Sequence, residues 1–171
     1  MRTRAAALAL LAACSPTGRA APDEAARSAV ADTITQKAAL FAQMVNRRDA
    51  AAVMTLFADD RDMTYAENGM LYPSRDSLER AITALYGAQR ELTFGWDELR
   101  VVPLASDAGV LLGRFHVLGL DLAGTTVRVD RGTWTGVFVR RNGRWVIVHA
   151  HESYPPPVVH RAPRRAAAKK R

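Results

Sequence analysis

The dipeptide Asn142-Gly143 lies between two apolar segments and constrains the fold more than any other feature of the chain. Asn-Gly favours a two-residue turn between antiparallel strands, because both residues tolerate the positive φ angles that such a turn needs. If these two residues form the loop and the strands pair without interruption, Trp134 lies opposite His151. The sequence therefore predicts a β-hairpin near the end of the chain, with a register that can be followed from the turn.

Uninterrupted pairing gives this hairpin two different faces, because side chains alternate along a strand. An aromatic face then carries Trp134, Phe138, Trp145, Ile147, His149 and His151, and a Val/Thr face carries Thr133, Thr135, Val137, Val139, Val146, Val148, Ala150 and Glu152. Both faces are largely apolar, so we expect both to be covered. We expect the aromatic face to line a core or pocket, and the Val/Thr face to pack on a second subunit or another layer.

Helical patterns precede this hairpin. Segments 23–48, 50–57 and 75–86 carry apolar residues at helical spacing. Asp49 is suited to cap the second of them, and Ser74 or Asp76 lies at the start of the third. Short strands are predicted at 62–66 and 70–72, and longer antiparallel strands at 91–102, 110–118 and 126–139. This order predicts an α+β fold in which helices gather on one face of a curved sheet.

Positive charge is concentrated at the two ends of the chain. The net charge is +7, but eight positive residues lie in the first four and last eleven positions, so the chain between them carries about −1. The domain is therefore not expected to bind nucleic acid. The basic tail, residues 158–171, is predicted to be disordered. It either attracts anionic lipids, wall polymers or nucleic acid, or serves as a solubilising end.

The first residues have the layout of an export signal. Arg2 and Arg4 precede a short apolar run that ends at Cys14, the only cysteine. The tetrapeptide 11–14, Leu-Ala-Ala-Cys, resembles the lipobox of bacterial lipoproteins, which implies cleavage before Cys14 and a lipid on its sulfur. Cleavage near residue 20, or an Ala-rich start without a targeting role, are the alternatives. A single cysteine excludes an internal disulfide and a thiolate metal cluster.

This layout divides the chain into four parts. We expect a signal peptide at 1–13, a tether at 14–23, one domain at 24–157 and the basic tail at 158–171. The expected location is the cell envelope, with the lipid anchor on the periplasmic side of a membrane, or the secreted fraction.

Several short motifs resemble the nuclear transport factor 2-like superfamily, in particular its SnoaL-like and DUF4440-type branch. They are Phe-Ala-Asp-Asp at 57–60, Gly69 in a turn, and the ending Gly-Arg-Trp-Val-Ile-Val-His-Ala-His-Glu-Ser at 143–153. The resemblance covers residues 26–154. It implies a cone in which a strongly curved antiparallel sheet wraps around three helices and encloses a pocket. It also implies a homodimer formed through the outer face of the sheet.

One member of that superfamily, ketosteroid isomerase, provides a test of catalytic residues. Its general-base position corresponds to Tyr65, with Glu67 two residues on, and its oxyanion-hole tyrosine corresponds to Phe41. Its second oxyanion residue, an aspartic acid, corresponds to Gly136 or Thr135. All three roles depart from the pattern, and abstraction of a proton beside a carbonyl needs a base and an oxyanion stabiliser together.

Chemistry on this chain is therefore sought among its histidines and carboxylates. His149 and His151 are expected on one side of one strand, and Asp130 is expected on the same face, so the three could act as an acid/base group. Metal binding by the two histidines, with Asp130 or His116 as a third ligand, and a purely structural role are the alternatives. We expect no metal and no other cofactor. Glu152 is expected to face away from the pocket.

A small organic ligand is expected in an apolar pocket. Its predicted contacts are Phe41, Tyr65, Trp96 and Trp134, and Tyr72 is placed at the mouth. The favoured function is an exported, lipid-anchored binding domain that forms a homodimer. The alternatives are an envelope enzyme of the isomerase, cyclase or dehydratase type, and a structural envelope protein that works through its basic tail.

Overall fold

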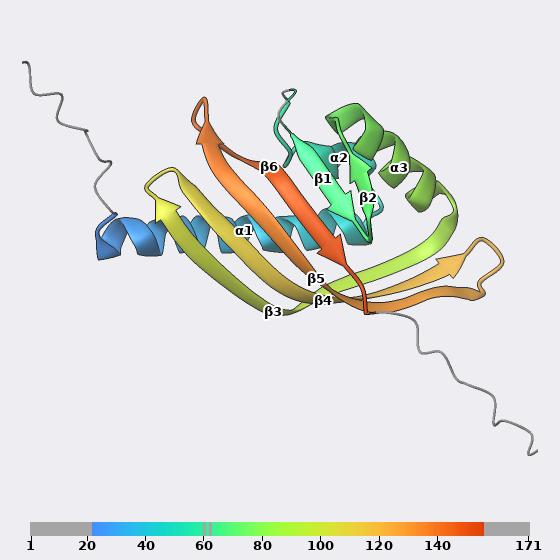
Figure 1. Ribbon diagram of the computed structural model, residues 1–171. Helices are drawn as coiled ribbons and strands as arrows, with labels where there is room; N and C mark the ends of the chain where they lie inside the picture. Colours follow the sequence, from blue (N-terminus) through green and yellow to red (C-terminus); the bar gives the residue numbers. More distant parts are fainter. Residues whose placement is uncertain (1–21, 60, 62, 156–171) are drawn as a thin grey trace, which may run out of the picture.

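The computed structural model describes residues 22–59, 61 and 63–155 (Figure 1). Within this part of the chain, three helices and six strands follow one another in the expected order: two helices, two short strands, a helix and four long strands. The helices are α1 (Glu24–Asn46), α2 (Ala50–Met54) and α3 (Arg75–Gly87). The strands are β1 (Thr64–Glu67), β2 (Met70–Tyr72), β3 (Gln89–Ala105), β4 (Ala108–Asp121), β5 (Thr126–Arg141) and β6 (Arg144–Ser153). The predicted α+β class is confirmed.

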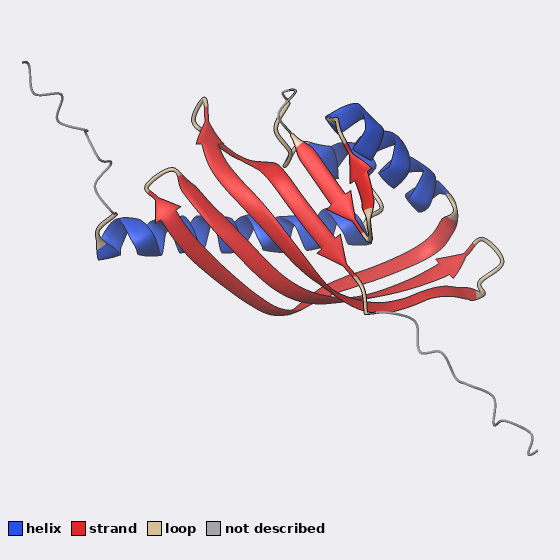
Figure 2. Cartoon of the chain, viewed as in Figure 1, coloured by secondary structure: helices blue, strands red, loops and turns tan. Residues whose placement is uncertain are grey.

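All six strands belong to one curved sheet in the order β2-β1-β6-β5-β4-β3. Neighbouring strands are antiparallel except β1 and β6, which run parallel. The long strands are antiparallel as predicted, whereas the fully antiparallel sheet that the resemblance implied is corrected by this one parallel pair. Helix α1 crosses the face of the sheet that is turned away from the viewer, and α3 lies near its β1 and β2 end (Figures 1 and 2).

The helices begin where the sequence provides caps. Asp49 accepts a hydrogen bond from the Ala52 N–H at 2.9 Å, and Ser74 forms a reciprocal capping box with Ser77 at the start of α3. Helix α2 ends three residues before its predicted end. Its continuation is a hydrogen-bonded turn that leads to Phe57, which forms a β-bridge with Ile147 of β6. The Ile147 N–H donates to the Leu56 carbonyl at 2.8 Å, so that carbonyl is paired with the sheet and not with a further helical turn.

The core fills the space between the helices and the inner face of the sheet. Its largest fully buried side chains are Ile34, Met54, Met63, Leu111, Phe115 and Ile147. Ile34 of α1 lies so close to Gly109 of β4 that a Cβ there would come within 2.6 Å of its Cδ1 atom. Close packing of this kind fixes α1 against the strands that carry most of the inner face.

The Asn142-Gly143 turn is confirmed, and so is the register beside it. Both residues have positive φ angles, 50° and 78°, as the predicted turn requires. Phe138 pairs with Ile147, but the next residue of β5, Val137, pairs with His149. Val148 is therefore an extra residue in β6, and it forms a β-bulge.

This bulge changes which side chains face inward along the second half of β6. Trp134 pairs with Glu152 and not with His151, as uninterrupted pairing predicted. The expectation that the two histidines share the face of Trp134 is therefore wrong, and so is the expectation that Glu152 lies on the opposite face. A single unpaired residue moves every following side chain to the other side of the sheet.

Some predictions concern residues outside the described part of the chain. These are the signal and lipid-anchor site at Cys14, most of the tether and the basic tail. The backbone of Asp130 pairs with Val117 in the ladder of β4 and β5, but its side chain lies outside the description as well. Among the described residues, no helix is long and apolar enough to span a membrane.

Candidate functional site

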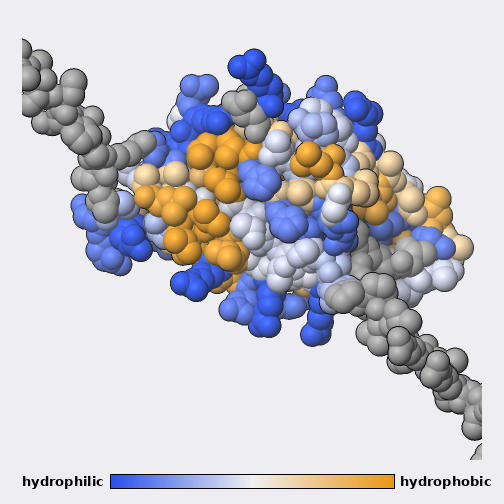
Figure 3. Space-filling model, in the orientation of Figure 1, coloured by the Kyte–Doolittle hydropathy of each residue, from blue (hydrophilic) through white to orange (hydrophobic). Residues whose placement is uncertain are grey.

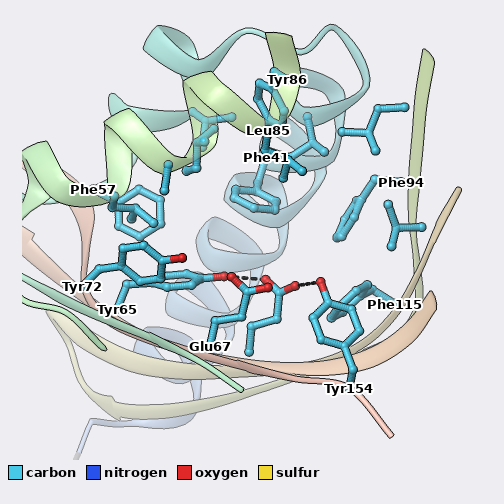
Figure 4. A pocket seen from close by; sticks show the side chains of 18 residues that line it. Phe41, Phe57, Tyr65, Glu67, Tyr72, Leu85, Tyr86, Phe94, Phe115 and Tyr154 are labelled. Atoms are coloured by element: carbon cyan, nitrogen blue, oxygen red, sulfur yellow. Dashed lines mark hydrogen bonds between the residues drawn. The ribbon is translucent and has the colours of Figure 1, made fainter. Parts of the chain in front are cut away.

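A cavity of about 230 Å³ lies between the helices and the inner face of the sheet (Figure 4). Its wall is mainly aromatic and aliphatic. Side chains from α1, α2, α3 and five strands contribute to it, among them Phe41, Phe57, Leu78, Ile82, Phe94 and Phe115. The volume is below the roughly 300 Å³ at which pockets for drug-sized molecules begin, so the space suits a smaller molecule.

Two carboxylates interrupt this apolar wall. Glu67 of β1 and Glu152 of β6 both line the cavity, and they pair directly across the two parallel strands. The hydroxyl groups of Tyr65 and Tyr154 each donate a hydrogen bond to Glu152, one to each carboxylate oxygen. Figure 4 shows these two tyrosines on either side of Glu67, along the same edge of the cavity. Four polar side chains therefore converge at one end of an otherwise apolar space.

Local structure holds these groups in place. The bulge at Val148 turns Glu152 inward, as described above. The turn between β1 and β2 then ties the end of β6 to β1: the Asn68 side chain accepts from the Tyr154 N–H at 3.0 Å, and the Asn68 N–H donates to the Glu152 carbonyl at 3.2 Å. These bonds fix the backbone on both sides of the carboxylate.

Burial raises the pKa of the Tyr65 phenol well above its usual value near 10. The negative charge of Glu152, its hydrogen bond with Tyr65 and the charge of Glu67 act in the same direction. The Trp134 indole acts in the opposite direction and lowers the pKa of Tyr65, because its N–H lies near enough to favour the phenolate. This buried N–H has no hydrogen bond of normal geometry. The pKa of Tyr72 is raised by burial and by the same two carboxylates. Tyr65 therefore remains a hydrogen-bond donor at neutral pH.

The raised pKa of Tyr65 predicts a loss of stability at alkaline pH. The unfolded chain releases this proton near pH 10, whereas the folded chain retains it, so folding is favoured below pH 10 and the contribution is lost above it. The free energy of unfolding, measured with urea, should therefore decline between about pH 9 and 11. Tyr65→Phe should make this decline shallower by up to about 1.4 kcal/mol per pH unit. Tyr72→Phe should remove a smaller part of this decline, because the pKa of Tyr72 is raised less than that of Tyr65. Curves for both variants that run parallel to the wild type would contradict the assignment.

The structure does not bring the predicted histidines into this cavity. The Nδ1 atom of His149 lies 2.8 Å from the Thr64 hydroxyl oxygen, on the outer face of the sheet. His151 is exposed and pairs with Thr135. His116, the alternative third metal ligand, lies 2.6 Å from Asp97 on the outer face. Among the described residues, no group of three or more His, Cys, Asp or Glu side chains could hold a metal ion.

Two of the four predicted ligand contacts line the cavity. They are Phe41 and Tyr65. Trp96 and Trp134 lie behind Phe41, with ring centroids 6.1 and 5.9 Å from its ring, and they belong to the packed core. The Trp96 indole donates to the Ala38 carbonyl at 2.9 Å, which satisfies its polar atom without a ligand. The tryptophans therefore support the wall of the cavity from behind.

Sequence reasoning missed Glu152 and Tyr154 as site residues. Glu152 was assigned to the wrong face because the bulge has no signal among four consecutive apolar residues at 145–148. Tyr154 follows the last strand, where only its proximity to proline residues was informative. Glu67 was recognised only as a neighbour of Tyr65, because its pairing with β6 joins segments that are far apart in the sequence.

Comparison with known proteins identifies relatives of this fold. A family model described as a SnoaL-like domain matches residues 34–157. A nuclear transport factor 2-like superfamily protein from Salmonella enterica serovar Typhimurium is 18% identical, with a TM-score of 0.69 over 77% of this chain and 94% of that chain. An uncharacterised protein with a cystatin-like fold from Caulobacter vibrioides is 17% identical, with a TM-score of 0.62 over 74% and 89%.

A third similar structure is an NTF-2 like protein of unknown function from Shewanella oneidensis. It is 24% identical, with a TM-score of 0.58 over 71% of this chain and 97% of that chain. No curated protein matches the sequence. At these identities the structural likeness establishes the fold and leaves the function to be argued from the site.

Proposed function

The chain belongs to the SnoaL-like domain family of the nuclear transport factor 2-like superfamily, and from this premise we propose that it binds a small organic molecule in its cavity. The observation that carries the proposal is the composition of the cavity. A continuous aromatic and aliphatic wall meets converging polar groups at one end, among them Glu67 and Glu152. Binding sites for small molecules combine these two features, since the wall supplies affinity and the polar groups fix orientation.

Proton transfer on the bound molecule is a second candidate function. It is favoured by the contact between a carboxylate and a phenol that remains protonated, Glu152 and Tyr65, at the edge of the cavity. A carboxylate can accept a proton and a phenol can donate a hydrogen bond to developing negative charge. Under this alternative, Glu152→Gln would still bind the molecule but would no longer convert it.

The outer face of the sheet supports the further proposal of a homodimer. Val102, Val110, Leu112, Val137 and Val139 lie side by side on adjacent strands and point away from the helices; we call them the outer apolar patch. Leu112 exposes 42% of its surface. Figure 3 shows apolar atoms gathered on this face. A second copy of the chain would cover them.

Export and lipid attachment at Cys14 belong to the same proposal. They are supported by the two arginines, the apolar run and the lipobox-like tetrapeptide at the start of the sequence. The protein would then present its cavity at the surface of a membrane in the cell envelope, anchored by the lipid.

Native mass spectrometry of the full chain from its own cells tests these proposals together. We expect a dimer, a mass increment on the peptide that begins at Cys14, and a co-purifying organic molecule that denaturation releases. Ala81→Trp, which fills the cavity from α3, should abolish the co-purifying mass. Ala84→Trp, on the exposed side of the same helix, should retain it. The same bound mass in both variants would place the molecule outside the cavity and refute the binding site.

A further inference from the structure

The polar end of the cavity is built mainly from groups that accept hydrogen bonds. Glu67 and Glu152 line the cavity from neighbouring strands, and their backbones pair directly. An ionised carboxylate has about four acceptor positions and no proton to donate. Figure 4 shows Glu67 at the edge of the space. Any molecule that enters the cavity therefore meets carboxylate oxygens at this end.

The two tyrosines that contact Glu152 add to the acceptors. A phenol has one proton, and Tyr65 and Tyr154 each donate theirs to Glu152. Toward the cavity, each of these hydroxyl oxygens then offers its lone pairs. Tyr72, whose hydroxyl can donate as well as accept, is half-buried beside Tyr65 with ring centroids 5.9 Å apart. Among these five side chains, acceptor positions therefore outnumber the protons that a ligand could receive.

This arrangement favours ligands that bring a donor of their own. When a ligand covers the Glu67 carboxylate, it displaces water that would donate to the oxygens, and an apolar ligand replaces none of those hydrogen bonds. A ligand with a hydroxyl or N–H group restores one, and a hydrogen bond to a charged group is stronger than one between neutral groups. Sites built in this way reject analogues without the donor more strongly than sites that select by shape alone.

The rest of the cavity determines the body of the ligand. Phe41 of α1, Phe57 after α2 and Phe94 of β3 present their rings to the space. An apolar cavity of about 150 Å³ accepts benzene, so a cavity of about 230 Å³ has room for two fused rings. Aromatic ligands gain stacked and edge-to-face contacts with a wall of this kind.

We propose that the cavity selects aromatic molecules of one or two rings that carry a hydrogen-bond donor, a hydroxyl or an N–H group, at one end. The donor binds the carboxylate of Glu67, and the rings occupy the space between the phenylalanines. This inference rests on the proposed binding function and specifies the chemical class of its ligand. It predicts discrimination between molecules of equal shape that differ only in the donor.

Indole and benzofuran test the inference, because benzofuran has an oxygen atom where indole has its N–H group. Each is titrated near pH 7 into the full chain and followed by the amide NMR shifts of the residues that line the cavity. We expect indole to bind at least about tenfold more tightly, which is the effect of one hydrogen bond to a charged group. Equal affinities would overturn the inference and leave the cavity as a binding site.

Substitutions of Glu67 identify the acceptor. Glu67→Leu removes it and should abolish the preference for indole, whereas Glu67→Gln retains an amide oxygen and should keep a reduced preference. Glu98→Leu is the matched control: Glu98 pairs with Arg114 on the outer face, and its substitution should leave the preference at the wild-type value. Circular dichroism verifies that each variant is folded. A preference that survives undiminished in either Glu67 variant would contradict the assignment.

Failure of the two probes is separable from failure of the proposed function. If neither probe shifts the cavity amides, the inference fails, because its ligand class does not bind. The proposed function is then decided independently, by the co-purifying mass and its response to Ala81→Trp.

Discussion

Phe115→Ala is expected to lower the free energy of unfolding by about 3 to 5 kcal/mol, the range observed when a buried phenylalanine is truncated. Phe115 exposes 1% of its surface, and its ring stacks on Phe94 with centroids 5.3 Å apart and meets Tyr154 at 5.6 Å. The neighbouring rings belong to β3 and to the segment after β6, and both backbones are fixed by the sheet, so the rings cannot collapse into the space. Urea unfolding followed by circular dichroism measures the loss.

Leu118→Ala provides the matched control for this substitution. Leu118 lies on the same strand but faces outward, with 40% of its surface exposed, and lies outside the outer apolar patch. Its truncation should cost less than about 1 kcal/mol. Equal losses for the two variants would show that the inner face of β4 is not the core. Because Phe115 also lines the cavity, its truncation widens the binding site.

Local patterns in the sequence predicted most of this fold. Asp49 and Ser74 cap helices where expected, and the Asn142-Gly143 turn forms with the positive φ angles it requires. These features depend on a few neighbouring residues, so the sequence contains the whole of their physical cause. Helix α2 is the local exception, since its length is limited by pairing with Ile147 far along the chain.

The site was predicted less well because its geometry depends on long-range pairing. Phe41 and Tyr65 were found since their periodicity or motif placed them inward. Glu152 was misplaced by a single bulge, and its partner Glu67 reaches it only through parallel pairing of β1 with β6. Neither the bulge nor the parallel pairing can be predicted from the order of apolar and polar residues. When a bulge lies inside an apolar run, the same sequence pattern is compatible with two registers. The error that moved the histidines inward is the same error that moved Glu152 outward.

Gly136→Val is expected to destabilise the protein by about 3 kcal/mol through overpacking. A Cβ atom at this position would lie 2.2 Å from the Trp134 ring, far closer than atoms can approach. The ring has no space to retreat into, because Phe41, Trp96 and Phe138 surround it with centroids 5.9, 5.9 and 6.4 Å away. Thr135→Val, on the outer face, adds a similar side chain without this contact and should change stability by less than about 1 kcal/mol. A Gly136→Val variant as stable as the wild type would contradict the packing described here.

The two core substitutions should have opposite consequences for the cavity. In Gly136→Val, the Trp134 ring can only press on its neighbours, among them Phe41, so a displaced Phe41 would narrow the space available to a ligand. Phe115→Ala removes part of the wall and widens it. Both lower the stability of the fold, so a general loss of structure would weaken every ligand in both variants. Titration with ligands of graded size separates the two explanations. If Phe115→Ala prefers larger ligands and Gly136→Val prefers smaller ones, these aromatic residues set the size of the bound molecule.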